Sequence, residues 1–279
     1  MRFVHCAVVA GVVVTVAGCA TADPPAPSGP SSAVSGSSGT AAAERTYPGL
    51  SPEYRASFRP DHTDLGGRSN AELAQLLPAS STFPPEGRAQ PPNVAAEDGS
   101  GLGLRGQTAG ETKPPQCLYT PFGKNFSRAS DGSDWNLYYA ASVGYTGPDG
   151  SRVTVTVDRQ RVGSDVVALT TSWMSTCGTY DRAFPTFANP QVRNQRVTTA
   201  FTREQTTSGV QTYRFVASSR SLDDATTGKP LPSGAGVTRV LLARVRSVVF
   251  TVEATGKIGY ADLDAMLATA IANAEAAPR

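Results

Sequence analysis

The stretch VTRVLLARVRSVVFTVEA, residues 237–254, is the clearest β-forming region of the chain and decides its fold. β-Branched and aromatic side chains favour strands, and an alternation of apolar residues is typical of a strand with one buried face. Two such runs are present, one with Val240 and Leu242 and one with Val248, Phe250 and Val252. We therefore expect two strands that meet near residues 244–246.

A hairpin is also expected earlier in the chain. Residues 136–145 read as a strand with Leu137, Tyr139, Ala141, Val143 and Tyr145 on one parity. The turn signal GPDG follows at residues 147–150, and Val153, Val155 and Val157 then alternate with polar residues. Residues 196–203 and 211–218 are weaker strand candidates.

Three segments carry helix signals. Ser69 and Glu72 have the spacing of a capping box, and Pro78 ends that short helix. Ser164 is the expected cap of a second helix that runs to about residue 180. A C-terminal helix is predicted from the apolar stripe Leu263, Met266, Leu267, Ala270 and Ile271. The predicted fold is α+β: a single domain with one antiparallel sheet and two or three helices packed on it.

The N-terminus carries an export signal. Val16-Ala17-Gly18-Cys19 closes an apolar run and resembles the lipobox of a bacterial lipoprotein signal peptide. The resemblance implies a signal peptide over residues 1–18, cleavage before Cys19 and acyl chains, such as palmitate, on Cys19. It also implies a protein held by its lipid on the extracytoplasmic face of the cell membrane. The alternative is an ordinary secreted protein in which Cys19 has no role.

Composition divides the mature chain. Residues 20–45 are almost wholly Ala, Ser, Gly, Pro and Thr, a composition that cannot bury enough apolar surface to fold. We expect a disordered tether over residues 19–68 and a folded domain over residues 69–279. The chain carries a net charge of +2, and loss of Arg2 with the signal leaves about +1. Nucleic acid is therefore not an expected partner, because nucleic-acid binders need a basic excess.

Two cysteines remain beyond the anchor, Cys117 and Cys177. Disulfides persist in exported proteins, so we expect these two to be joined. The alternative is two buried thiols. No metal or other cofactor is expected, because His62 is the single histidine of the mature chain and no CxxC motif is present.

Catalytic and nucleotide-binding motifs are not supported by their context. Residues 101–106 match GxGxxG, but polar and glycine-rich sequence surrounds them instead of a strand and a helix. The chain has no GxSxG motif, and a Ser-His-Asp triad would need His62 from the poorly structured lead-in. We therefore expect no enzyme. Paired carboxylates of a hydrolase stay open as an alternative, because their spacing is set in space.

Two groups of side chains are candidates for a ligand-binding surface. Trp135, Tyr138, Tyr139 and Tyr145 gather around the first predicted strand, and Tyr138 is the surface candidate because it has the opposite parity. Arginines recur in the predicted strands, and Arg244 and Arg246 are the candidates nearest to a strand end. The alternative is that the tyrosines belong to the core and that the arginines are an ordinary solvated face.

Short motifs resemble a group of actinomycete envelope lipoproteins that are related to the extracellular sensor domain of PknH-type kinases. They are Leu76-Leu77-Pro78 with Phe83-Pro84, residues 114–117, the 173–177 helix end, residues 241–250 and the final helix. A second lipoprotein group, with a PsbP-like sheet, fits the same order of elements. The resemblance implies a non-catalytic, sensor-like domain that binds an envelope lipid, glycan or protein. A structural or interaction lipoprotein of the cell wall is a further alternative.

Overall fold

The sheet is built around the hairpin expected from residues 237–254. In the computed structural model, β9 (Ala235–Val245) and β10 (Val248–Thr255) are antiparallel, with Val248 opposite Val245. The connecting residues Arg246 and Ser247 have φ of +46° and +70°. Two-residue hairpin loops of the twist-compatible type need positive φ at both positions. The expected meeting point of the two strands is thus confirmed.

The structure describes residues 59–97, 112–117, 137–186, 189–207, 210–224, 227, 229–230 and 235–279. All of them belong to one compact unit, residues 42–279. The expected signal peptide, the lipid site Cys19 and the tether up to residue 58 lie outside the described residues.

Ten described strands form one sheet in which every pairing is antiparallel. Besides β9 and β10 they are β1 (Arg88–Ala89), β2 (Asn93–Val94), β3 (Thr112–Lys113), β4 (Leu137–Thr146), β5 (Arg152–Gln160), β6 (Thr179–Thr186), β7 (Asn189–Thr207) and β8 (Val210–Asp224). Their order is β1-β4-β5-β10-β9-β8-β7-β6-β3, and β2 also pairs with β4. The predicted β4–β5 hairpin is confirmed. The weaker strand candidates are β7 and β8, both longer than expected, and β6 was not predicted.

The described helices are α2 (Asn70–Ala74), α3 (Val166–Thr176) and α4 (Tyr260–Ala276), with short 3-10 turns η1 (Asp64–Gly67), η2 (Ser80–Thr82) and η3 (Pro115–Cys117). The capping box of Ser69 and Glu72 is present as predicted. The cap of α3 is Asp165 instead of Ser164, because the Asp165 carboxylate accepts from two backbone N–H groups of the first turn. None of the described helices is long and apolar enough to cross a membrane.

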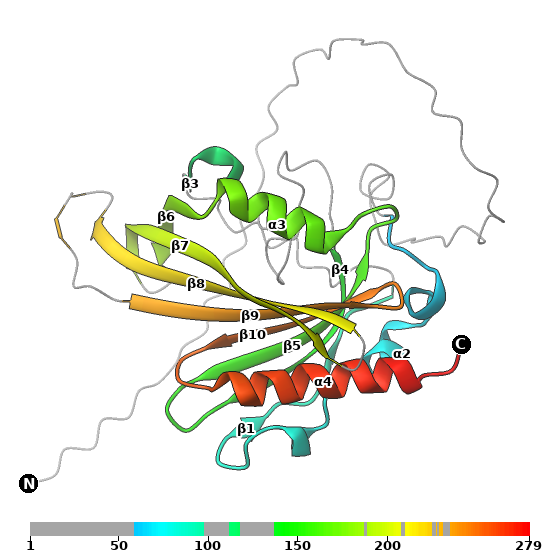
Figure 1. Cartoon of the computed structure of the whole chain (residues 1–279). Coiled ribbons are helices and arrows are strands. Elements are labelled where there is room, and N and C mark those ends of the chain that lie inside the picture. The colour runs from blue at the N-terminus through cyan, green and yellow to red at the C-terminus, as the bar shows by residue number, and fades with distance from the viewer. Residues whose placement is uncertain are drawn as a thin grey trace, which may run out of the picture. The chain divides into compact units, whose positions relative to one another are not determined.

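The helices lie on both faces of the sheet. Figure 1 shows α2 and α4 against one face, here called the α4 side, and α3 over the other, the α3 side. The main core fills the α4 side, and the predicted stripe of α4 is buried in it. The architecture is α+β, as predicted.

A β-bulge in β4 changes which side chains share a face. Tyr139 pairs with Asp158 and Ala141 pairs with Val157, so Ala140 is an extra residue in β4. A side chain alternates between faces at every residue, and one extra residue therefore inverts the pattern on one side of it. The predicted common parity from Leu137 to Tyr145 is wrong for this reason.

The lower boundary of the folded domain also needs correction. Leu65 is fully buried in the main core. Pro60 forms an isolated bridge with Arg161, and the Asp61 N–H donates to the carbonyl of Gln160 at 2.6 Å. Residues 59–68 are therefore part of the fold, which begins at Arg59 or earlier and not at residue 69.

Candidate ligand-binding face

The two faces of the sheet differ in polarity although both are buried. On the α4 side, the inward residues of β5 and β10 are apolar, as in Val153, Val155 and Phe250. On the α3 side, the neighbouring positions of β4, β5 and β10 carry polar side chains. A buried polar group is more informative than a buried apolar one, because it needs partners to offset its desolvation.

Five residues make up this polar region, here called the polar cluster: Tyr139, Ser142, Thr156, Asp158 and Thr251. Ser142 pairs with Thr156, and Thr156 pairs with Thr251, so three hydroxyl groups lie side by side across three strands. Tyr139 and Asp158 form the next row. Asp158 is only 4% exposed and Thr251 only 2%. The cluster is thus a buried part of the sheet and not a solvated surface.

Hydrogen bonds connect most of the polar cluster. The Tyr139 hydroxyl donates to the carbonyl of Asn93 at 2.8 Å, so the 2.8 Å contact with Ser142 is donated by the serine. The Thr156 hydroxyl donates to Asp158 Oδ2 at 3.1 Å. Burial raises the pKa of Tyr139 above its usual value, with a further contribution from the Asp158 charge. The phenol therefore stays protonated at neutral pH.

Some buried acceptors in this region have no protein partner. Within the described part of the chain, Thr251 Oγ1 and Gln160 Oε1 make no hydrogen bond, and neither does Ser164 Oγ in the connection to α3. Gln160 ends β5 on the same side as Asp158 and Thr156, which lie two and four residues before it. An unmet buried polar group costs about 1–3 kcal/mol. Water or a polar ligand would remove that cost.

The arrangement suits hydrogen bonding better than acid–base chemistry. It offers hydroxyl and amide groups around one carboxylate, Asp158. The other acid that β4, β5 and β10 carry on the α3 side is Glu253, which is exposed and pairs with Thr154, four residues from Asp158 along β5. At about 3.4 Å per residue, Asp158 and Glu253 are separated by roughly 13 Å, more than the carboxylate spacing of either glycosidase type. The described residues contain no group of three or more His, Cys, Asp or Glu placed to hold a metal.

Tyr138 is not the surface residue that its parity predicted. It is 2% exposed, and its hydroxyl accepts from the Arg59 N–H at 3.0 Å. Because of the extra residue Ala140, Tyr138 pairs with Arg159 and points away from the polar cluster. Trp135, the other aromatic candidate, lies outside the described residues.

Arg246 is a structural residue and not an open ligand-binding group. Its guanidinium donates to both Asp64 oxygens at 2.6 and 2.8 Å. A third nitrogen donates to the carbonyls of Ala274 and Ala277 at the end of α4. These bonds join η1, the β9–β10 turn and α4. The ligand-binding prediction for Arg246 is therefore corrected, since its donors are already used.

For Arg244, the ligand-binding role stays a prediction. It is exposed and pairs with Val249, which in turn pairs with Asp158. Arg244 and Asp158 therefore share one row of the α3 side, two strands or about 10 Å apart. This position is at the margin of the polar cluster.

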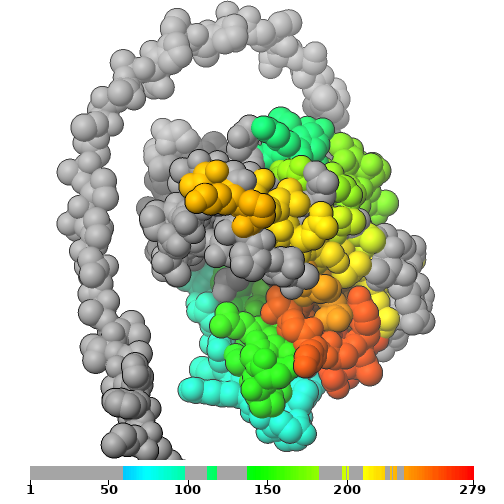
Figure 2. All heavy atoms as spheres, turned by 90° about the vertical axis from the view of Figure 1, so that its left-hand side faces the viewer, coloured from blue at the N-terminus to red at the C-terminus, as the bar shows by residue number. Residues whose placement is uncertain are grey.

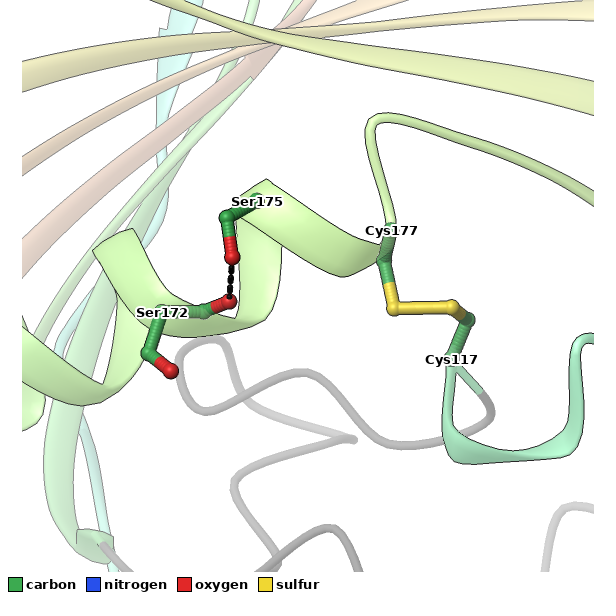
Figure 3. Close-up of a disulfide and its surroundings, with 4 residues drawn as sticks. All are labelled: Cys117, Ser172, Ser175 and Cys177. Carbon is green, nitrogen blue, oxygen red and sulfur yellow. Dashed lines mark hydrogen bonds between the residues drawn. A yellow bond between two sulfur atoms is a disulfide. The ribbon is translucent and has the colours of Figure 1, made fainter.

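The disulfide prediction is confirmed. Cys117 at the end of η3 is bonded to Cys177, the C-cap of α3, with Cα atoms 5.5 Å apart. Figure 3 shows the bridge beside the last turns of α3, where the Ser175 hydroxyl donates to the Ser172 carbonyl. Cys177 packs with Trp173 under β7. The bridge thus fixes the end of the helix that lies over the α3 side.

The polar cluster was not predicted from sequence. Thr154, Thr156 and Asp158 alternate with valines and read as the solvated face of a half-buried strand. The alternation is the same whether the polar face meets water or protein, so periodicity carries no signal for this burial.

No protein-family model matches the chain, and no curated protein matches it. Two solved structures resemble it. One is the extracellular domain of PknH from Mycobacterium tuberculosis, at 13% identity and a TM-score of 0.46, over 77% of this chain and 100% of that one. The other is an uncharacterised protein of Mycobacterium smegmatis, the Rv0999 ortholog, at 13% identity and a TM-score of 0.40, over 75% and 97%. The first of these is a domain of the kind that the sequence motifs resemble. At this identity no ligand, partner or activity is carried over from either neighbour.

Proposed function

We propose that the protein is an envelope lipoprotein, anchored through Cys19 on the extracytoplasmic face of the cell membrane. Its folded domain binds a polar, hydroxyl-bearing ligand through the polar cluster without transforming it. The observation that carries the binding proposal is that two buried acceptors have no partner among the described residues: Thr251 Oγ1 in the hydroxyl row, and Gln160 Oε1 four residues along β5 from Thr156.

The composition of the polar cluster favours binding over catalysis. The hydroxyl groups of Ser142 and Thr156 donate within the cluster and can each still accept, and Asp158 accepts strongly, which suits the donating hydroxyl groups of a glycan or a lipid headgroup. Within β4, β5 and β10, the nearest second carboxylate is Glu253, which lies farther from Asp158 than glycoside hydrolysis requires. Arg244 at the margin would favour a ligand that carries a negative group.

The anchoring proposal rests on sequence, with support from the disulfide. The residues around Cys19 have the pattern of a lipobox. The Cys117–Cys177 bridge fits an oxidising compartment, in which such bonds persist.

The binding proposal is tested by native mass spectrometry of the protein extracted from membranes of a mycobacterial host. We expect a non-covalent adduct on the wild type that is lost in the Thr156→Val/Thr251→Val variant. Thr269→Val is the matched control, because its hydroxyl bonds to Ala265 within α4 on the other side of the sheet. An adduct that survives in the double variant, or no adduct at all, contradicts the proposal. Release of a cleaved product would instead indicate a hydrolase.

The anchoring proposal is tested separately by labelling cells with radioactive palmitate. The wild type should incorporate label and fractionate with membranes. Cys19→Ala should remain an unlabelled, uncleaved precursor, because the thiol that takes the lipid is gone. Normal labelling of Cys19→Ala would refute the assignment.

A further inference from the structure

Three arginines of β8 and β9 lie on the α4 side of the sheet, at and beyond the N-terminal end of α4. We call this surface the arginine face. It consists of Arg214 and Arg220 on β8 and Arg239 on β9. The strand register also places Arg203 of β7 opposite Arg214 and Arg196 of β7 opposite Arg220.

The pairing shows that these residues share one face. Arg214 pairs with Leu241, and Arg239 pairs with Ala254, two residues of the core beneath α4. The β8–β9 register continues without a shift to Arg220, six residues after Arg214, so the side chains of Arg214 and Arg220 lie on the same side.

α4 meets the margin of the arginine face but does not cover it. Arg214 forms an ion pair with Asp264 of α4, and the guanidinium carbons of Arg214 and Arg239 lie 4.9 and 5.6 Å from the ring centre of Tyr260. Further along β8, Arg220 is exposed. In Figure 2 the yellow and orange atoms of β8 and β9 lie above the orange atoms around the start of α4.

The described part of this surface carries uncompensated positive charge. Asp264 neutralises Arg214. Arg239 donates to the carbonyl of Gly256 at 2.8 Å and has no carboxylate partner among the described residues. Arg220 makes no ion pair within the described part of the chain. The acid Asp181 is in register with Arg196 at the far edge of the sheet.

We propose that the arginine face docks on the anionic phospholipid headgroups of the membrane that holds the protein. A guanidinium group can bind two phosphate oxygens at once. Arg239 pairs with Val216, two residues from Arg214 and four from Arg220, so the three arginines are spread about 8 and 14 Å apart over an extended surface. The choice of the membrane rests on the proposed anchoring at Cys19. Forty residues, 19 to 58, separate Cys19 from Arg59, and their composition predicts a tether. A random coil of that length has a root-mean-square end-to-end distance of about 35 Å, which would keep the domain close to the bilayer at high effective concentration.

The test uses the unlipidated mature chain, residues 19–279 with Cys19→Ala, and sedimentation with vesicles. One set of vesicles contains phosphatidylcholine with about 30% phosphatidylglycerol, and the other contains phosphatidylcholine alone. The variant is Arg220→Gln/Arg239→Gln. The control is Arg88→Gln/Arg152→Gln, which removes two exposed arginines in one row of the α3 side. Thermal unfolding verifies that each variant is folded.

The wild type should bind the anionic vesicles, more weakly at high salt, and should not bind phosphatidylcholine. Each arginine removed near an anionic surface lowers partitioning about fivefold, so the Arg220/Arg239 variant should lose about 25-fold. The Arg88/Arg152 control should lose much less. Equal losses in both variants, no preference for anionic vesicles, or binding to soluble polyphosphate but not to vesicles would each overturn the proposal. Because this chain has no lipid, such a failure leaves the anchoring at Cys19 standing.

Discussion

Replacing Thr251 by Val should stabilise the ligand-free protein. Thr251 is 2% exposed, and its Oγ1 has no hydrogen-bond partner among the residues that the structure describes. Val has the same branched shape and a similar preference for strands, so the change removes a polar atom without a new cavity. In most proteins a buried substitution destabilises, and this variant should be an exception.

The magnitude follows from desolvation. A buried polar group without a partner costs about 1–3 kcal/mol, and that cost disappears when the hydroxyl becomes a methyl group. For a domain of this size, each kcal/mol raises Tm by about 2–4 °C. The neighbouring Thr156 provides an internal comparison. Its hydroxyl donates to Asp158, so Thr156→Val should destabilise by about 1–3 kcal/mol.

The assay is calorimetric and urea-induced unfolding of both variants with the disulfide intact and bound ligand removed. Ligand must be absent because a ligand that binds the native state would stabilise the wild type selectively. Opposite signs at two positions that pair directly, Thr251 and Thr156, are the expected result. If Thr251→Val destabilises as much as Thr156→Val, the Thr251 hydroxyl is satisfied and the binding argument fails.

Three further predictions concern the frame around the site. The hydrogen bond from Arg246 lowers the pKa of Asp64 in the folded protein. The Asp64 carboxylate therefore stabilises the fold at pH values above its unfolded pKa of about 3.9, and this stabilisation is lost as the pH falls through the lower pKa of the folded state. Between about pH 7 and pH 3, the free energy of urea unfolding should therefore fall less for Asp64→Asn than for the wild type; equal falls would contradict the assignment. Asn is chosen because Asp64 has a φ of +45°, a left-handed conformation that Asn tolerates. Cys117→Ala/Cys177→Ala should lower the unfolding free energy by about 4 kcal/mol, since the bridge spans 60 residues, and reductant should reproduce the effect on the wild type. Tyr138→Phe should cost about 1 kcal/mol in urea unfolding through its lost backbone hydrogen bond, and an unchanged midpoint would show that the hydroxyl faces water.

Much of the fold could be predicted because its local signals agree with its tertiary structure. The capping box at Ser69, the turn at residues 147–150 and the stripe of α4 each depend on neighbours within a few residues. β6 was missed, and the alternation along β7 and β8 was weak. Long strands at one end of a sheet are specified by pairing with distant strands more than by local alternation.

The candidate site could not be predicted because its causes are not local. One extra residue, Ala140, decides that Tyr139 and not Tyr138 joins the polar cluster, and alternation alone does not reveal a bulge. Arg246 binds Asp64, which is 182 positions away in the sequence. Nothing in the sequence therefore indicates that the N–H donors of Arg246 already have a partner. Tertiary contacts decided both outcomes.

A crystal structure of the protein purified from envelope membranes tests the central claim most directly. We predict ligand density within hydrogen-bond distance of Thr251 Oγ1 and Gln160 Oε1, in contact with the hydroxyl row of the polar cluster. Protein side chains or ordered water alone on those two atoms, with no ligand density on the α3 side, would contradict the account.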